Sequence, residues 1–336
     1  MPFDNLSGIK TKKFNLGLFI LLTFLALAAS LLIPGLGLLG AALLPVPASL
    51  LFIKGRVRDG IICAGLSCLV LFLFGYILPP VIMALIIAAA FSHRYAVEKK
   101  WPAWNTIGAV FAAFAGAVVL YLVIYVLFYG PGALSGISGA YNSYIDSMGE
   151  DPLFSSYARL MMIERADLDA VISQTQSVMR FLPRILPGIL AVSFAVISLA
   201  NYLFSANIYR RNQIDIKPFK PFIAWDLPWY YVWGIIIGLI LVLIPEMGET
   251  VDGSKALADQ AADVIGFNLV IIFGFLYAVL GMSVLWGIFA RFRLGLLARV
   301  VIIAVLWFFF AAALFVFPLL GLIDIWANFR RLKRDQ

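Results

Sequence analysis

The sequence predicts an all-α fold, a polytopic transmembrane helix bundle of about eight to ten membrane segments, some of them short or broken by proline. Hydrophobic residues make up 63% of the 336 residues and charged residues only 13%, about half the charged share of a soluble domain. The apolar residues gather in runs of about 17 to 25, the length at which a helix crosses a bilayer. Basic residues occur in short clusters between these runs, as in the cytoplasmic loops of membrane proteins.

The apolar runs define the predicted segments of a single integral membrane domain, residues 1–336. The first run follows three lysines and resembles a secretory signal peptide, but its length and the runs that follow it favour an uncleaved first helix. Pro45 and Pro47 interrupt the second run, and the fourth run is short, which indicates a tilted, an extended or a re-entrant helix. The predicted segments are residues 16–33, 36–53, 60–78, 81–91, 106–129, 185–204, 229–244, 264–289 and 300–317.

The distribution of lysine and arginine predicts which loops face the cytoplasm. Each basic cluster is separated from the next by two predicted segments, so all of them fall on one side of the membrane. Two acidic loops, residues 130–180 and 246–263, fall on the other side. We therefore expect a multi-pass protein of the bacterial cytoplasmic (inner) membrane whose N-terminus is cytoplasmic. The clusters are Lys10, Lys12 and Lys13; Lys54, Arg56 and Arg58; Arg94, Lys99 and Lys100; Arg210, Arg211, Lys217 and Lys220; and Arg291, Arg293 and Arg299.

Residues 130–180 are predicted to form an extracytoplasmic amphipathic insertion. Residues 130–143 are rich in glycine and serine, which predicts a flexible connection. Residues 153–182 carry an apolar stripe at helical spacing, typical of an amphipathic helix. This helix either lies on the outer leaflet or forms a lid over an opening on that side.

The last apolar run, continued to Arg330, is too long for one upright helix and too short for two full spans. If this run crossed the membrane once, the basic tail would lie outside, whereas all the other basic clusters are predicted to lie on the cytoplasmic side. We expect Pro318 and Gly321 to break the segment, so that residues 320–336 form an interfacial amphipathic tail on the cytoplasmic side. On this predicted helix Asp324, Asn328 and Arg331 share one polar face.

The sequence carries no signature of an enzyme, a metal site or a cofactor site. One histidine, His93, excludes a zinc motif with two histidines, and neither a Gly-rich phosphate loop nor a GxSxG nucleophile motif occurs. His93 stands beside Arg94 at a predicted membrane boundary, where we interpret it as a snorkelling interfacial side chain. The basic residues form separate clusters instead of one face, which argues against nucleic acid as a partner.

Four polar residues within the predicted segments have two interpretations. Polar side chains in hydrocarbon seek partners for about 1 kcal/mol each, so they commonly hold helices together. In the second interpretation they line a binding site for a small molecule. The candidate residues for this site are Asn268, Tyr277, Asn201 and Ser283.

The segment 106–129 carries small residues four apart on one helix face, namely Gly108, Ala112 and Gly116. Small side chains let helix backbones approach closely in lipid. This stripe predicts either packing within the protein or a face for another membrane protein.

Three short motifs together resemble a known family. Trp225-Asp-Leu-Pro228-Trp229 opens one predicted segment, Asn268 opens another that reaches Gly281-Met-Ser283, and Gly321-Leu-Ile-Asp324 precedes Asn328-Phe-Arg-Arg-Leu332. In this order they resemble the YybS-like predicted membrane proteins of bacteria over most of residues 15–332. That family is distantly similar to the substrate-binding components of energy-coupling-factor transporters. The resemblance implies a helical bundle that takes up a vitamin or a metal ion from outside and docks on an energising module, although those proteins have about six spans.

Two functions are therefore expected from different classes. The first is an uptake component that binds a small molecule in an outward-facing cavity, with the lipid bilayer and a further membrane protein as partners. The alternative is a membrane scaffold or regulator that transports nothing. The first predicts a pocket near Asn268, whereas the second predicts tight packing there and an exposed groove of small residues.

Overall fold

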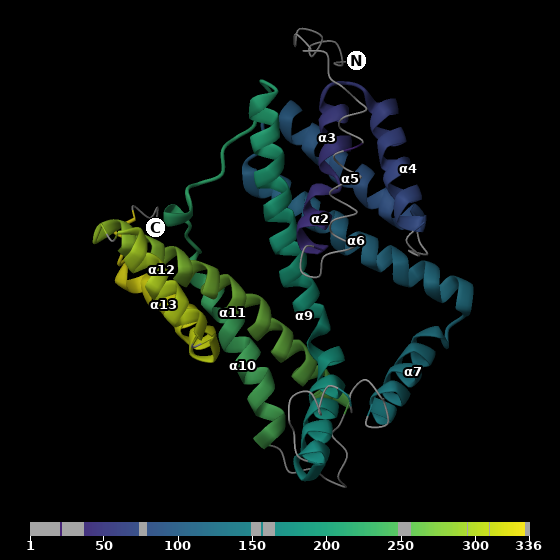
Figure 1. Ribbon diagram of the computed structural model, residues 1–336, viewed down its shortest axis with the longest axis vertical. Coiled ribbons are helices and arrows are strands. Elements are labelled where there is room, and N and C mark those ends of the chain that lie inside the picture. The colour runs from purple at the N-terminus through teal and green to yellow at the C-terminus, as the bar shows by residue number, and fades with distance from the viewer. Residues whose placement is uncertain are drawn as a thin grey trace. The chain divides into compact units, whose positions relative to one another are not determined.

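The computed structural model describes residues 37–73, 79–148, 165–247, 257–293, 295–308 and 310–332, together with Leu21 and Ser156. Every regular element in these ranges is a helix (Figure 1). The predicted segment 16–33, apart from Leu21, and residues 248–256 of the acidic loop 246–263 lie outside the described residues. The helices are α2 (Gly37–Leu43), α3 (Val46–Ile53), α4 (Val57–Leu73), α5 (Pro79–Glu98), α6 (Ala103–Tyr129), α7 (Ala133–Ser147), α9 (Arg165–Arg211), η3 (Phe222–Ala224), η4 (Trp229–Tyr231), α10 (Val232–Met247), α11 (Leu257–Arg291), α12 (Leu296–Phe308) and α13 (Phe310–Ala327).

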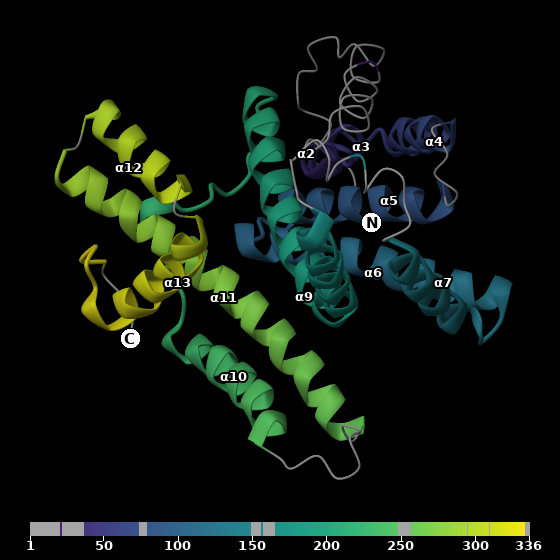
Figure 2. The same ribbon diagram turned by 60° about the horizontal axis from the view of Figure 1, so that its bottom comes forward.

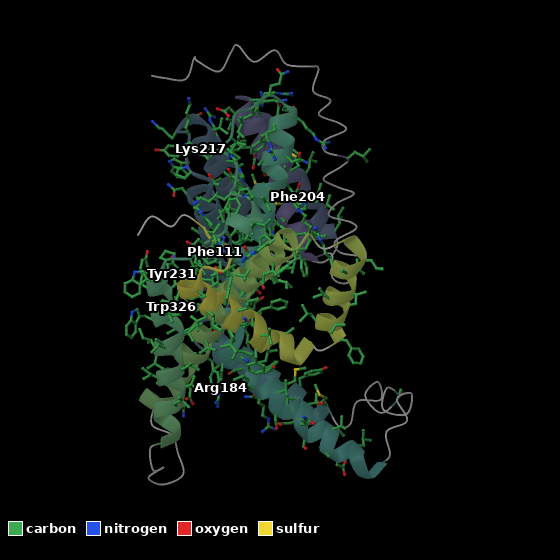
Figure 3. All side chains as sticks on the ribbon, turned by 90° about the vertical axis from the view of Figure 1, so that its left-hand side faces the viewer. Phe111, Arg184, Phe204, Lys217, Tyr231 and Trp326 are labelled. Carbon is green, nitrogen blue, oxygen red and sulfur yellow. The ribbon has the colours of Figure 1, made fainter. Side chains whose placement is uncertain are left out.

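Four described helical stretches have the length and the apolar composition to cross a membrane: residues 79–98, 103–129, 168–211 and 260–291. Shorter apolar helices accompany them. The outward-facing side chains are also apolar, as at Leu127, Phe128 and Phe308, which are 78%, 82% and 84% exposed. Carbon dominates the side-chain sticks throughout the described residues (Figure 3). An apolar surface is stable against lipid and not against water, which confirms the predicted all-α polytopic membrane fold.

The contacts divide the chain into two compact units. Unit 1 comprises residues 1–139 and 193–219, and unit 2 comprises residues 140–192 and 220–336. The long helix α9 contributes to both. That the whole chain forms one integral membrane domain stays a prediction.

In unit 1 the predicted break at the second segment is confirmed, because α2 ends at Leu43 and α3 begins at Val46. Pro47 occupies the first turn of α3, where no N–H is needed for a helical hydrogen bond. All eight residues of α3 are buried, so this helix lies in the core of the unit. Gly60 of α4 leaves room for the ring of Phe52.

In unit 2, α10 and α11 lie side by side, and α13 packs against α11 (Figures 1 and 2). Glycines permit both contacts. A Cβ atom on Gly266 would stand 2.8 Å from the carbonyl oxygen of Gly238 on α10, and one on Gly321 would meet the carbonyl oxygen of Tyr277. Close approach of this kind supplies the packing that the hydrophobic effect does not supply within lipid.

The predicted flexible connection over residues 130–143 is wrong, because α7 covers Ala133–Ser147. Glycine and serine disfavour a helix on their own, but contacts to α9 stabilise this one. The Tyr141 hydroxyl donates to the Met179 carbonyl at 2.7 Å, and Arg180 pairs with Asp146 at 2.6 Å. In a helix the carbonyl of Met179 would accept the N–H of residue 183, but Pro183 has no N–H. The Met179 oxygen is therefore available to the Tyr141 hydroxyl.

Residues 165–182 of the predicted amphipathic stretch and the sixth predicted segment form one helix, α9, of 47 residues, about 70 Å long. The sequence predicted a separate surface helix or lid. Pro183 and Pro187 lie inside α9 without ending it. Proline is tolerated in such helices where neighbouring groups satisfy the freed backbone atoms.

The predicted break at Pro318 and Gly321 is wrong, because α13 continues through both residues to Ala327. Residue 309, between the last residue of α12 and the first of α13, lies outside the described residues. The predicted amphipathic helix of the tail, over residues 322–332, is also wrong. The helix α13 ends at Ala327. After it, Asn328 and Arg331 have positive φ angles of 46° and 52°. Asn328 and Arg331 therefore do not share a helical face with Asp324. Residues 333–336 of the predicted tail lie outside the described residues.

Candidate functional site

The four candidate residues are divided between the two units. Asn201 belongs to unit 1, and Asn268, Tyr277 and Ser283 belong to unit 2, where each has its own surroundings. Each environment therefore has to be judged separately.

Asn268 binds backbone atoms of α9 at the prolines. Its side-chain oxygen accepts the N–H of Gly188, and its amide nitrogen donates to the carbonyls of Arg184 at 2.7 Å and of Val264 at 2.5 Å. Gly188 and Arg184 are four apart, the spacing that a regular helix pairs. A Cβ on Gly188 would stand 2.7 Å from the Asn268 oxygen. Asn268 thus lies in tight packing, with both amide hydrogens and the oxygen engaged.

Tyr277 lies at the crossing of α11 and α13 and is completely buried. Its backbone carbonyl faces Gly321, and its hydroxyl has no hydrogen-bond partner in the described residues. Ser283, two turns further along α11, points to a different set of groups. Its hydroxyl donates to the Phe222 carbonyl at 2.5 Å and accepts a hydrogen bond from Arg330 at 2.7 Å.

Arg330 is the centre of a buried network that the sequence analysis missed. Its guanidinium donates to the Asp324 carboxylate at 2.8 and 3.1 Å, and to the carbonyls of Ile223 and Trp225 at 2.9 and 2.7 Å. The side chains of Arg330 and Asp324 are 1% and 0% exposed. We call Arg330, Asp324 and Ser283 the C-terminal clasp. The sequence placed Asp324 on a polar face with Arg331, whereas Asp324 is buried and pairs with Arg330.

The clasp brings together the motifs on which the family resemblance depends. The loop before Trp229, the Gly281-Met-Ser283 stretch of α11 and the end of α13 all contact it. Gly287, near the end of α11, faces the Arg330 side chain. The turn 328–332 therefore lies beside the loop 222–225 and the C-terminal end of α11.

Unit 1 contains a second buried polar centre, formed by His93 of α5 and Asn201 of α9. The His93 Nε2 and the Asn201 Oδ1 lie 2.7 Å apart, and the Asn201 amide nitrogen donates to the Ala42 carbonyl at 2.7 Å. Both side chains are fully buried, so the interpretation of His93 as a snorkelling interfacial residue is wrong. His93 lies seven residues after Ile86 and four residues after Ala89, both of which are buried. This spacing places His93 on the buried face of α5.

Asn201 is one member of a polar stripe on α9, formed by Ser198, Asn201, Ser205 and Tyr209. Spacings of three and four residues place them on one helix face, and all are fully buried. The Ser198 hydroxyl and His93 Nδ1 have no partner in the described residues. The Tyr209 hydroxyl faces those of Ser205 and Ser49 at a geometry outside that of a regular hydrogen bond.

Other buried serines of this unit behave differently. Ser49 and Ser67 donate to the carbonyls four residues earlier, at 2.7 and 3.0 Å, the usual way for a serine in a helix to satisfy its hydroxyl. Ser198 and Ser205 make no such bond. The stripe therefore presents polar atoms that are buried and available.

The small-residue stripe of α6 faces outward. Gly108, Ala112 and Gly116 are exposed, and a Cβ added to either glycine would meet none of the described residues within 4 Å. Within the described residues no group of three metal-binding side chains occurs.

Comparison with known proteins gives one result. A family model described as "Predicted membrane protein (DUF2232)" matches residues 20–325 of the chain. No curated protein and no solved structure matches it.

Proposed function

Since the chain belongs to this DUF2232 family of predicted membrane proteins, we propose that it is a bacterial inner-membrane component that binds a small molecule for uptake and catalyses no reaction. The N-terminus and the basic clusters face the cytoplasm, and the solute enters from the other side. The YybS-like motifs, with their distant similarity to substrate-binding components of energy-coupling-factor transporters, support this role. A further membrane protein then supplies the energy.

The observation that carries this proposal is the polar stripe beside His93. A buried polar group without a partner costs free energy, and polar residues within membrane segments commonly mark the path of a substrate. A bound solute would supply the partners that the protein does not. The proposed site comprises Asn201, His93, Ser198, Ser205 and Tyr209.

Of the four candidate residues predicted from the sequence, the proposed site includes Asn201 and leaves out the other three. The amide of Asn268 is fully engaged by backbone groups, and Ser283 is engaged by the clasp. Tyr277 lies at the crossing of α11 and α13, and no hydrogen bond joins its hydroxyl to another of the described residues.

Native mass spectrometry of the full chain in lipid nanodiscs tests the proposal. The wild type should retain a small molecule, and the double variant Ser198→Ala/Ser205→Ala should lose it. Ser67→Ala is the matched control, because the Ser67 hydroxyl already bonds to the Cys63 carbonyl, and it should retain the molecule. Absence of a retained molecule in the wild type, or equal retention by both variants, would refute the function.

A scaffold role is the second candidate, favoured by the exposed stripe of α6. A partner helix could pack closely on Gly108, Ala112 and Gly116, because all three are exposed and nothing in the described part of the chain lies within 4 Å of a Cβ built on either glycine. Gly108→Leu/Gly116→Leu should then reduce the size of the complex on a native gel of solubilised membranes. Gly65→Leu on α4, which also has open space around it, should leave the size unchanged; an unchanged size in the stripe variant would reject this role.

A further inference from the structure

We infer that the solute held at the polar stripe carries no net charge and donates a hydrogen bond to Nδ1 of His93. This inference deepens the proposed function and rests on it. Its first step concerns which nitrogen of His93 carries the hydrogen.

The orientation of the Asn201 amide fixes that nitrogen. The amide nitrogen donates to the Ala42 carbonyl, and the reversed orientation would set two oxygen acceptors against each other. The Asn201 oxygen therefore faces His93 Nε2 at 2.7 Å. An amide oxygen only accepts, so Nε2 carries the hydrogen and donates it.

The second step follows from the chemistry of the neutral imidazole ring. When Nε2 carries the hydrogen, Nδ1 presents a lone pair and acts as an acceptor. This nitrogen is buried and has no hydrogen-bond partner in the described residues. It therefore suits a ligand that brings an O–H or N–H donor.

The third step concerns charge. The buried polar side chains described in unit 1 are Ser49, Ser67, His93, Thr106, Ser198, Asn201 and Ser205, together with the hydroxyl-bearing Tyr202 and Tyr209, and none of these carries a permanent charge. An ionised solute among them would lose its hydration without gaining a counter-ion, which is strongly unfavourable in a protein interior. A neutral solute avoids this cost.

The serine hydroxyls restrict the chemical class of the solute further. Each hydroxyl can donate and accept. Ser198 and Ser205 lie seven residues apart on α9, about 10 Å along the helix, so one of the two hydroxyls can serve an acceptor of the small solute whose donor reaches His93. A hydroxyl or a primary amide provides donor and acceptor together. The geometry thus points to a small uncharged alcohol or amide.

The test uses the fact that His93 is the sole histidine of the chain. Full-length protein labelled with [¹⁵N]histidine, in lipid nanodiscs, gives imidazole nitrogen signals that belong to His93 alone. The unliganded protein should show a hydrogen-bearing Nε2 and a bare Nδ1. A hydrogen on Nδ1 would overturn the inference.

Three probes of similar size then separate charge from donor capacity. Acetamide is neutral with a donor, acetone is neutral without one, and acetate is an anion. Titration with acetamide should shift the Nδ1 signal more than the Nε2 signal, whereas acetone and acetate should leave both unchanged. No shift with acetamide, or an equal shift with acetate, would overturn the inference.

Failure of the inference and failure of the proposed function give different results. If the molecule retained in the mass spectrometry experiment is ionised, the solute class is wrong and the binding function stands. If the wild type retains nothing and no probe shifts either nitrogen, both are refuted.

Discussion

The side chain of Asn268 accepts the backbone N–H of Gly188, across the boundary between α11 and α9. The same amide donates to the Arg184 carbonyl, so Asn268 contacts both groups that a regular helix would pair with each other. Pro187 lies between them and Pro183 just before them. A side chain inserted beside prolines in this way satisfies the backbone where a helix bends.

Asn268→Leu should therefore destabilise the protein without removing a ligand. Loss of the amide leaves buried backbone groups of α9 without a partner, which costs about 1–3 kcal/mol. Thermal unfolding in detergent measures this loss, and Asn105→Leu, at an exposed position of α6, should change stability little. The Asn268→Leu variant should retain the small molecule as the wild type does. If it is as stable as the wild type but loses the molecule, Asn268 belongs to the solute site and this prediction is wrong.

Asn268 also illustrates what the sequence reveals of the candidate site and what it hides. A polar residue in an apolar run indicates that some contact exists, and Asn268, Asn201 and Ser283 all make one. The partners of Asn268 are backbone atoms, which leave no mark in the pattern of residue types. His93 was missed for a related reason, since its partner is 108 residues away along the chain.

The fold was more predictable than the site because length and hydrophobicity set the membrane segments directly. The breaks were harder to predict. Pro318 predicts a helix end, yet it lies inside α13. The glycines and serines of residues 130–143 predict a loop, yet tertiary contacts to α9 stabilise a helix there. Local preference of about 1 kcal/mol per residue is overridden where packing supplies partners.

Arg330→Ala should be among the most destabilising single substitutions. It would leave the fully buried Asp324 carboxylate without its cation, and breaking a buried ion pair from one side costs about 3–5 kcal/mol. The neighbouring Arg331 is exposed, so Arg331→Ala is the matched control and should change the unfolding temperature little. Equal effects of the two substitutions would contradict the clasp.

Arg330→Lys should fall between these variants. Lysine keeps the positive charge for Asp324 but lacks the planar fork that reaches the carbonyls of Ile223 and Trp225 together. Unfolding measured in the same detergent should rank wild type, Arg330→Lys and Arg330→Ala in order of decreasing stability. A lysine variant as stable as the wild type would show that the contacts to the loop contribute nothing.

Gly321→Ala should weaken the crossing of α11 and α13. The added Cβ would meet the Tyr277 carbonyl and stand 2.8 Å from the backbone nitrogen of Gly281, and overpacking of this kind costs about 1–3 kcal/mol. Gly274→Ala on α11 has nothing within 4 Å, and should be neutral or stabilise the helix by up to about 1 kcal/mol. Chemical denaturation of both variants measures the difference, and a stable Gly321→Ala would mean that the two helices do not touch there.

The clasp also predicts on which side of the membrane the C-terminal turn lies. Arg330 contacts Ile223 and Trp225 directly, so cysteines introduced by Lys220→Cys and Arg331→Cys should react with an impermeant thiol reagent from the same compartment. Both native cysteines, Cys63 and Cys68, are buried and are replaced by alanine to remove background labelling.

Ser177→Cys supplies the opposite reference for this labelling. Ser177 is exposed near the N-terminal end of α9, whereas the basic cluster at Arg210 and Arg211 lies at its C-terminal end, so Ser177→Cys should react from the other compartment. In intact cells the reagent should label Ser177→Cys alone, and permeabilisation should be required for the other two. Labelling of Arg331→Cys but not of Lys220→Cys in intact cells would place the C-terminal turn and Lys220 in different compartments and would contradict the contact of the turn with the loop 222–225.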